Sequence, residues 1–407
     1  MNYKEFKLEN GLRVVSVYKE TKFASIRIGV NVGALDENDE QAGISHFVEH
    51  LVFQGTQKRT NEELLRDLSL YCGDYNGYTS RNKTVYMFDT LTEDVEQTLD
   101  ISSDMLMNSK FDENDIERER NIILSEIKIA LDDVRIYGHD TAMKLAFPDD
   151  DISKTEDGSL SSVRKITSNE IREYYKTYYV PENTCIVIIS EYNQEYIKEI
   201  IEKYFGKWKN SCLPRKKRDM SMNMISGEHH YILSERQQEN LHYMYCIKDL
   251  SEVDMIRLNL LCRRLGFGMS SLLWGKLRSE LGVTYDTYSD LTRYGNNAIL
   301  ECFAIVAPED IDIAKKGIEE AISELFNKSS YEEGLAITKK EALFDSLGQI
   351  EYPERLSEFI ISRMLEEKPF DIIEEYIDTI KNTTSEDLIE IANKVLNTPC
   401  IIHSLGK

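Results

Sequence analysis

Residues 44–52 (Ile-Ser-His-Phe-Val-Glu-His-Leu-Val) carry apolar side chains at their first, fourth, fifth, eighth and ninth positions. This spacing is typical of an amphipathic helix, which turns one apolar stripe toward the core. At about 100° per residue, His46, Glu49 and His50 project together from the opposite side. The segment is therefore predicted to be a helix that gathers three polar side chains on one face.

Two histidines that lie one helical turn apart suit two imidazole ligands of a single metal ion. Taken alone, each histidine would more often be an ordinary packed or solvated residue, so the motif by itself is a hypothesis. A catalytic zinc ion keeps three protein ligands and one open position. His46 and His50 would supply two of these ligands, so a third must come from elsewhere in the chain.

The predicted helix 112–134 offers two candidate carboxylates, Glu119 and Glu126, which lie seven residues apart and share one face. Glu126 has apolar neighbours in the sequence, so we expect it to be buried. A buried carboxylate needs a partner, because otherwise it costs several kcal/mol or becomes protonated. The partner is either a divalent cation or a basic residue of the same helix. With Glu126 as a ligand, Glu119 would suit a supporting role, in which it holds the other nitrogen of a ligand imidazole.

Glu49 precedes His50 on the same helical face, so we expect its carboxylate to reach a zinc-bound water without binding the metal. Zinc lowers the pKa of bound water to about 7. A neighbouring carboxylate can accept the proton and later deliver it to a leaving amine. A metal ion and a general base together predict hydrolysis, with a peptide bond as the expected target.

The chain of 407 residues is too long for one compact core and is expected to form two domains. Alternating strand patterns followed by helical patterns occur in the first half, and the same order repeats after residue 223. We therefore predict an α+β fold with two similar tandem domains, each a mostly antiparallel sheet packed with helices. The predicted segments are a zinc-containing peptidase domain at 1–208, a linker at 209–223 with a solvated basic run, and a homologous domain without the zinc motif at 224–407.

The order His-x-x-Glu-His, with Glu126 after 75 intervening residues, resembles the pitrilysin/insulinase family of inverted-motif zinc metallopeptidases. The similarity is strongest to its mitochondrial-processing-peptidase-like branch of short subunits, and it extends over nearly the whole chain. Segments 43–59 and 116–127 look very like the two catalytic segments of the family. The resemblance implies that zinc is bound by His46, His50 and Glu126, that Glu49 is the base, and that Glu119 is the supporting carboxylate.

Two further segments resemble motifs that bind substrate in this family. Residues 76–79 (Asn-Gly-Tyr-Thr) resemble Asn-Ala-x-Thr, beside a strand edge that pairs with bound peptide. Arg278 and Tyr285 match Arg-x-x-x-Gly-x-x-Tyr, whose Arg and Tyr contact substrate near the zinc. Taken alone, these two residues would be an exposed helix-end cation and a half-buried strand residue. The resemblance therefore implies substrate-binding roles for Asn76, Arg278 and Tyr285, and the replacement of the usual Ala by Gly77 concerns only the shape of the peptide groove.

The family closes its chamber with four domains, so a chain with two implies a second subunit. The zinc motif and the Arg/Tyr motif occur together here, which favours a homodimer over a heterodimer with a homologous subunit. A net charge of −23 argues against a nucleic-acid partner. No apolar run approaches the roughly 18 residues of a membrane-spanning helix, and the seven dispersed cysteines favour a reducing cytoplasm.

The sequence thus predicts a zinc endopeptidase that hydrolyses peptides or unfolded segments in a closed dimeric chamber. The alternative is a non-catalytic or half-active subunit of a heterodimeric processing peptidase, which binds a partner and a substrate peptide. The intact metal motif argues against this alternative. A metal hydrolase that acts on other substrates would fit the ligands but not the Arg/Tyr motif. Both peptide turnover and precursor maturation are open as biological roles.

Overall fold

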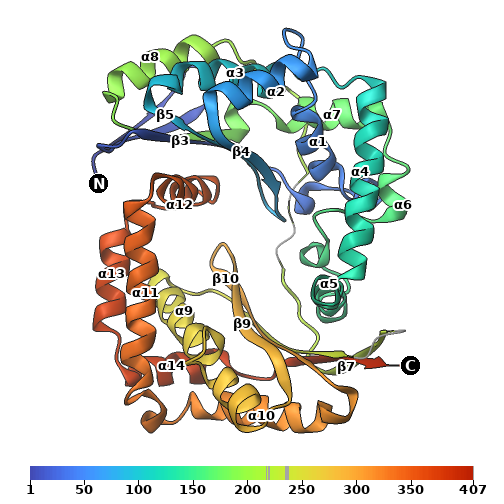
Figure 1. The fold of residues 1–407 in the computed structure, drawn as a ribbon, viewed down its shortest axis with the longest axis vertical. Coiled ribbons are helices and arrows are strands. Elements are labelled where there is room, and N and C mark those ends of the chain that lie inside the picture. The colour runs from blue at the N-terminus through green and yellow to red at the C-terminus, as the bar shows by residue number, and fades with distance from the viewer. Residues whose placement is uncertain (217, 219–220, 234–237, 407) are drawn as a thin grey trace. The chain divides into compact units, whose positions relative to one another are not determined.

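A computed structural model describes residues 1–216, 218, 221–233 and 238–406 (Figure 1). Residues 217, 219 and 220 of the predicted linker lie outside this described part. The chain divides into two compact units, which are described separately here. Unit one comprises Met1–Ala130, Lys154–Met220 and Gly348–Asp371, and unit two comprises Leu131–Ser153, Ser221–Leu347 and Ile372–Lys407.

The sheet of unit one has the strand order β1-β2-β6-β3-β5-β4. All neighbouring pairs are antiparallel except β2 and β6, which are parallel. The inner strand β6 is buried along its whole length, and it reads as an almost uninterrupted apolar run for that reason. The strands are β1 (Tyr3–Lys7), β2 (Arg13–Tyr18), β3 (Phe23–Val30), β4 (Cys72–Thr79), β5 (Thr84–Leu91) and β6 (Thr184–Ser190).

The sheet of unit two has the order β7-β11-β8-β10-β9, with β7 and β11 parallel and the other pairs antiparallel. If β1 is set aside, both sheets arrange their strands in the same order of first, fifth, second, fourth and third along the chain. The predicted fold class, two similar tandem α+β domains with mostly antiparallel sheets packed by helices, is therefore confirmed. The strands are β7 (Gly227–Leu233), β8 (Glu239–Ile247), β9 (Thr284–Tyr294), β10 (Asn297–Val306) and β11 (Cys400–Gly406).

The helices of the described residues cover these sheets, and none of them is long and apolar enough to cross a membrane. In unit one they are α1 (Ile44–Val52), α2 (Asn61–Tyr71), α3 (Val95–Asn108), α4 (Glu113–Asp132), α6 (Leu160–Val163), α7 (Ser168–Tyr178), α8 (Gln194–Phe205) and α12 (Pro353–Leu365). In unit two they are α5 (Val134–Ala146), α9 (Glu252–Gly266), α10 (Ile311–Glu324), α11 (Gly334–Glu351), α13 (Ile373–Asn382) and α14 (Ser385–Val395).

Each unit takes one helix from the other half of the sequence. Helix α12 packs on β3 and β6 of unit one. It lies so close to Gly29 that a Cβ atom there would come within 2.7 Å of Leu365 Cδ1. Helix α5 packs on β8 of unit two, where Asn240 Nδ2 donates a hydrogen bond to the backbone oxygen of Val134 at 2.7 Å. The predicted segments 1–208 and 224–407 are continuous in sequence, whereas the two units are not.

The predicted helix 112–134 is two helices in the structure. Helix α4 ends at Asp132, and the side chain of Asp133 then accepts hydrogen bonds from the backbone N–H groups of Arg135 and Ile136. This arrangement is an N-cap, which starts a new helix rather than continuing the old one. The chain accordingly passes from unit one to unit two close to this break.

The expectation that the basic run of the linker is merely solvated is wrong for two of its residues. The Arg218 guanidinium donates from Nη2 to the buried Asp36 carboxylate at 2.6 Å and to the backbone oxygen of Asn82 at 2.8 Å. Lys216 Nζ donates to the backbone oxygen of Glu37 at 2.7 Å. A buried carboxylate needs a partner, so this part of the linker is attached to unit one.

A buried carboxylate in β10, Glu301, joins α5 to the sheet of unit two. Its Oε2 lies 2.9 Å from His139 Nδ1 of α5, and its Oε1 lies 2.6 Å from His242 Nδ1 of β8. Burial acts to raise the pKa of Glu301, but the hydrogen bonds and charges of the two histidines outweigh it and hold the pKa well below its usual range. The folded state therefore favours the ionised carboxylate.

We expect Glu301→Gln to lower the free energy of unfolding by about 3 kcal/mol near pH 7, because it removes one partner of a buried charged cluster. The usual pKa of the carboxyl group is 4.5. Since folding lowers this pKa, the contribution of the carboxylate is present above pH 4.5 and is lost as the pH falls below it. Urea unfolding at several pH values should show that the difference in free energy of unfolding between wild type and variant becomes smaller as the pH falls. The exposed Glu309→Gln is the control, and a gap that widens toward acid would contradict the assignment.

Candidate metal centre and catalytic site

Helix α1 is held at its N-terminus by the buried carboxylate of Glu37, which accepts hydrogen bonds from the backbone N–H groups of Gly43 at 2.7 Å and Ser45 at 2.8 Å. Such groups have no partner within the helix, and a carboxylate also suits the positive end of the helix dipole. Burial raises the pKa of Glu37 to about 8, against the effect of these hydrogen bonds. The hydroxyl of Ser45 lies 2.7 Å from that of Tyr174 in α7, so the first turn is held on a second side.

Glycine is required at position 43, immediately before α1. Its φ is +93°, and a Cβ atom there would lie 2.5 Å from the backbone oxygen of Asp157. This close approach brings the loop that contains Asp157 next to the first turn of the helix. Asp157 Oδ1 lies 3.2 Å from His46 Nδ1 as a result.

The structure brings His46, His50 and Glu126 together from α1 and α4. His46 Nε2 lies 3.1 Å from His50 Nε2, and His50 Nε2 lies 3.5 Å from Glu126 Oε2. One atom from each of the three side chains lies within 4.8 Å of the other two. Among the described residues, no other trio of histidine, cysteine or acidic side chains meets this condition.

These separations suit a zinc ion. Zinc binds imidazole nitrogen at about 2.0–2.1 Å in tetrahedral geometry, which places two ligand atoms about 3.3 Å apart. Burial lowers the pKa of His46 to about 3, and the nearby His50 acts in the same direction. The imidazole of His46 is therefore neutral near pH 7 and has a lone pair available for a metal.

Each of the two imidazoles has a carboxylate at its other nitrogen. The buried Glu119 lies with Oε2 at 3.3 Å from His50 Nδ1, where the sequence predicts a supporting carboxylate. Burial acts to lower the pKa of His50, but the hydrogen bond to Glu119 and the charges of Glu126 and Glu49 outweigh it and raise the pKa. Carboxylates in this position orient ligand imidazoles and strengthen metal binding. Asp157 is the corresponding carboxylate at His46 Nδ1, and no motif in the sequence indicated it.

We expect Glu119→Gln and Asp157→Asn each to weaken zinc binding by about 10- to 100-fold, because each removes the carboxylate behind one ligand imidazole. Competition with a chromogenic chelator measures the affinity directly and requires no catalytic activity. Glu117→Gln, an exposed neighbour on α4, is the matched control. A variant that binds zinc as tightly as this control would show that its carboxylate has no supporting role.

The expectation that Glu126 is buried is wrong, because its side chain is 41% exposed. The apolar residues around it divide between two sides of α4. Ile123 and Ile127 are buried in the core, whereas Ile122 and Ile129 lie on the exposed side. The argument that a buried Glu126 needs a cation as its partner therefore does not apply. The case for Glu126 as a ligand rests instead on its closeness to His50.

Glu49 lies almost entirely within the protein, with 7% of its surface exposed. Its Oε2 accepts a hydrogen bond from Thr79 Oγ1 of β4 at 2.8 Å. Burial raises the pKa of Glu49 to about 7, against the effect of this hydrogen bond. A carboxyl group that titrates near neutral pH can both accept and return a proton, as a general base and acid must.

Residues 76–79 belong to the edge strand β4 itself rather than lying beside it. The exposed Asn76 accepts a hydrogen bond at Oδ1 from the backbone N–H of Gly77 at 2.9 Å. Because side chains alternate along a strand, Asn76 points away from the side on which Thr79 contacts Glu49. Thr79 is therefore the residue of this motif that touches the predicted base, and the sequence did not single it out.

Arg278 and Tyr285 lie together in unit two. The guanidinium carbon of Arg278 is 4.8 Å from the centre of the Tyr285 ring, a cation–π contact. Tyr285 is at the start of the edge strand β9 and is 78% exposed, more than a half-buried strand residue would be. Both side chains can thus present polar groups to a ligand of unit two.

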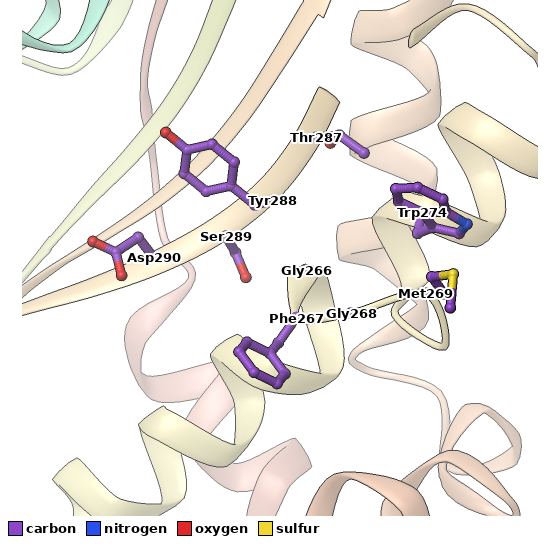
Figure 2. A pocket seen from close by; sticks show the side chains of 9 residues that line it. All are labelled: Gly266, Phe267, Gly268, Met269, Trp274, Thr287, Tyr288, Ser289 and Asp290. Atoms are coloured by element: carbon purple, nitrogen blue, oxygen red, sulfur yellow. The ribbon is translucent and has the colours of Figure 1, made fainter. Parts of the chain in front are cut away.

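Figure 2 shows a pocket between β9 and the turn that follows α9. A Cβ atom at Gly266 would lie 2.2 Å from the backbone nitrogen of Ser289, so the glycine allows α9 to end against β9. The turn joins two helical segments, as the sequence predicted, and it does not have the strand-to-helix position of a dinucleotide-binding loop. The pocket is lined by Gly266, Phe267, Gly268, Met269, Trp274, Thr287, Tyr288, Ser289 and Asp290.

Comparison with known families gives matches over most of the chain. Residues 13–144 match the family described as "Insulinase (Peptidase family M16)", and residues 165–339 match the one described as "Peptidase M16 inactive domain". The first match contains the histidine pair and Glu126, and the second contains Arg278 and Tyr285.

Relatives named as zinc proteases match in sequence. The chain is 28% identical over 308 residues to an uncharacterized zinc protease of Mycobacterium leprae, a match covering 74% of this chain and 68% of the relative. It is 26% identical over 400 residues to one of Rickettsia felis, covering 98% and 96%. It is also 36% identical over 204 residues to the mitochondrial-processing peptidase subunit beta of Neurospora crassa, covering 49% and 42%.

Solved structures with low sequence identity share the fold. A protease from Helicobacter pylori superimposes with a TM-score of 0.92 at 19% identity, covering 99% of each chain. A peptidase M16 inactive domain from Pseudomonas fluorescens gives 0.88 at 16% identity, covering 100% of this chain and 98% of the other. The tandem arrangement of two such domains is therefore one that experimental structures already contain.

Proposed function

The chain belongs to the insulinase (M16) peptidase family, and from this premise we propose that it is a zinc-dependent endopeptidase that hydrolyses peptides or unfolded segments. The observation that carries the proposal is the convergence of His46, His50 and Glu126, with Glu49 next to one of them on α1. A metal group alone could be structural. A buried carboxyl group with a pKa of about 7 beside it is what hydrolysis needs.

His46, His50 and Glu126 would hold the zinc ion, and Glu119 and Asp157 would fix the orientation of the two imidazoles. When bound, zinc would polarise the peptide carbonyl and make water a stronger acid. The neutral state of His46 favours this binding, because it needs no proton to be released.

Glu49 would act as the general base and then as the general acid. Its carboxylate accepts a proton from the attacking water and passes it to the amine that leaves when the peptide bond breaks. The hydrogen bond from Thr79 holds one carboxylate oxygen, so the other oxygen is available for the proton. Both steps use one side chain, which is why the base must stay close to the bond throughout.

The substrate peptide would pair with the edge of β4. This strand has β5 as its neighbour on one side and ends the sheet on the other. An unpaired edge offers backbone N–H and C=O groups to an extended peptide. Pairing of this kind recognises backbone more than side chains, so we expect loose sequence preference. Asn76 would lie at this edge. The resemblance gives unit two a substrate-binding role of its own, in which Arg278 would bind a carbonyl or carboxylate and the Tyr285 hydroxyl would stabilise a developing oxyanion.

We further propose that the enzyme works as a homodimer that closes a chamber around the peptide, because the metal motif and the Arg/Tyr motif occur on one chain. The second candidate is a subunit that needs a homologous partner for activity. The similarity to a processing-peptidase subunit favours this second candidate. Light scattering of the purified protein measures its oligomeric state. Peptidase assays before and after a co-encoded homologue is added then distinguish the homodimer from a subunit that needs a partner.

A cytoplasmic location is part of the same proposal. The seven cysteines are all unpaired in the structure, as suits a reducing compartment. Cell fractionation with an antibody against the chain tests this location.

The deciding experiment measures zinc per chain and the cleavage of quenched fluorescent peptides by the purified protein, with Glu49→Gln as the inactive comparison. About one zinc per chain and cleavage that a chelator stops would support the proposal. Bound zinc without cleavage of any peptide in a broad library, with or without a homologous partner, would refute it.

A further inference from the structure

Strand β4 is contacted from both of its faces. On the α1 side, Thr79 bonds to Glu49, and a Cβ atom at Gly77 would lie 3.0 Å from Glu49 Oε1. Tyr78, between these two residues, points to the opposite face. There its hydroxyl donates a hydrogen bond to Glu358 Oε1 of α12. Two consecutive residues of one strand thus connect the proposed base with a helix on the other side of the sheet.

Two cationic side chains lie near Glu358 and offset its charge. Lys83 Nζ lies 3.7 Å from its Oε1, and Arg27 Nε lies 3.9 Å from its Oε2. Arg27 is itself fixed, because its Nη1 and Nη2 donate to the two carboxylate oxygens of Asp89 at 2.8 and 3.0 Å. A bidentate ion pair between an arginine and a carboxylate has little freedom to move. The acceptor of the Tyr78 hydroxyl therefore lies beside a fixed cation.

Helix α12 also has contacts that fix it to the sheet independently of Tyr78. Ser357 Oγ lies 2.8 Å from the buried Ser25 Oγ of β3, and Leu365 packs over Gly29. An edge strand such as β4, by contrast, has a neighbouring strand on one side alone. Edge strands move more easily than inner ones, because half of their backbone groups lack a partner in the sheet. The bond to Glu358 thus attaches β4 on the α12 side, in addition to its pairing with β5 and its contact with α1.

We propose that Tyr78 and Glu358 are positioning residues, which fix β4 so that Thr79 holds the Glu49 carboxylate in its working orientation. The proposal rests on the proposed peptidase function and deepens it. Helix α12 belongs to the C-terminal half of the sequence, where its segment lies between two segments of unit two. A helix from the C-terminal half thereby contributes to the alignment of the base in the N-terminal half.

The kinetic test compares Tyr78→Phe, Thr79→Val and the double variant on a quenched peptide. Tyr78→Phe removes one hydroxyl and keeps the ring. We expect it to lower kcat by about tenfold with little change in KM, because a misplaced base weakens an interaction that is made only in the transition state. Because Tyr78 acts through Thr79, the double variant should be no slower than Thr79→Val, and Thr79→Ser should restore activity by returning the hydroxyl.

The matched control is Tyr18→Phe, which removes the same hydroxyl from an exposed tyrosine at the end of β2, a strand that does not neighbour β4. A Tyr78→Phe variant with the kcat of this control would overturn the proposal. The proposal would also be overturned if the fold-loss of kcat in the double variant equalled the product of the two single fold-losses, because Tyr78 would then act independently of Thr79.

Hydrogen exchange on the zinc-free protein gives a readout that does not depend on activity. Tyr78→Phe should speed amide exchange in residues 72–79 several-fold, with exchange in β3 unchanged, whereas the control Tyr18→Phe should leave exchange in residues 72–79 unchanged. Unchanged exchange in β4 would refute the positioning role even if the protein proved inactive. A different result would refute the peptidase function: the wild type binds zinc but cleaves no peptide, while Tyr78→Phe still exchanges faster than the wild type in β4. If Tyr78→Phe fails to fold, Glu358→Ala removes the same bond from the other side, with the same expected results.

Discussion

Glu49→Gln is expected to lower kcat for peptide cleavage by about 10²- to 10⁴-fold, the usual contribution of a positioned general base. The amide cannot take up the proton of the attacking water at any pH used for the assay. It keeps the size of the side chain and can still accept the hydrogen bond from Thr79 at its oxygen. The folded structure and the three metal-binding side chains should therefore be unaffected.

Three measurements separate loss of the base from other causes. Zinc content should stay at the wild-type value, the thermal unfolding midpoint should not fall, and kcat should collapse without a matching rise in KM. Glu62→Gln, an exposed residue of α2, is the matched control and should retain full activity. Cleavage that persists in Glu49→Gln at a tenth of the wild-type rate or more would mean that another group is the base.

His50→Ala is expected to abolish zinc binding and activity together. His50 is the member of the trio that lies within 3.5 Å of both others, at 3.1 Å from His46 and 3.5 Å from Glu126. Loss of a carboxylate behind a ligand already weakens metal binding by about 10- to 100-fold, so loss of the ligand itself should exceed this. The remaining two side chains cannot form the three-ligand site of a catalytic zinc ion.

The loss of zinc binding in His50→Ala can be measured by thermal unfolding, without any assay of activity. A ligand at 100 times its Kd stabilises a protein by about 2.7 kcal/mol, so added zinc should raise the unfolding midpoint of the wild type. The variant should show no such rise. His230→Ala, at an exposed histidine of unit two, is the control and should respond to zinc as the wild type does. A zinc-dependent rise that survives in His50→Ala would exclude this residue as a ligand.

Several features of the site were predictable because they depend on spacing within one helix. The histidine pair and Glu49 share a face of α1 through a separation of three or four residues. Glu119 and Glu126 share a face of α4 for the same reason, and the structure indeed places both at His50. Helical periodicity is local, so it survives in the sequence whatever the rest of the chain does.

Other parts of the site depend on contacts between distant segments. Asp157 reaches His46 because a loop more than 100 residues away in sequence packs against Gly43, where a side chain would not fit. Thr79 reaches Glu49 because β4 runs alongside α1. Neither contact leaves a periodic signal. The exposure of Glu126 was predicted incorrectly for a related reason, since its apolar neighbours divide between the core and the surface.

By itself, the sequence determined the helix that carries the histidine pair and the repeated α+β pattern, and it led to the proposal that Glu49 is the base, because these follow from side-chain periodicity and from motifs confined to short segments. The tertiary structure alone decided which carboxylate stands behind His46, which hydroxyl holds Glu49, and that α5 and α12 each pack on a sheet from the other half of the sequence. The physical reason is that these choices depend on burying complementary surfaces that are far apart in the chain. Burial of that kind is set by the whole fold and not by any one segment.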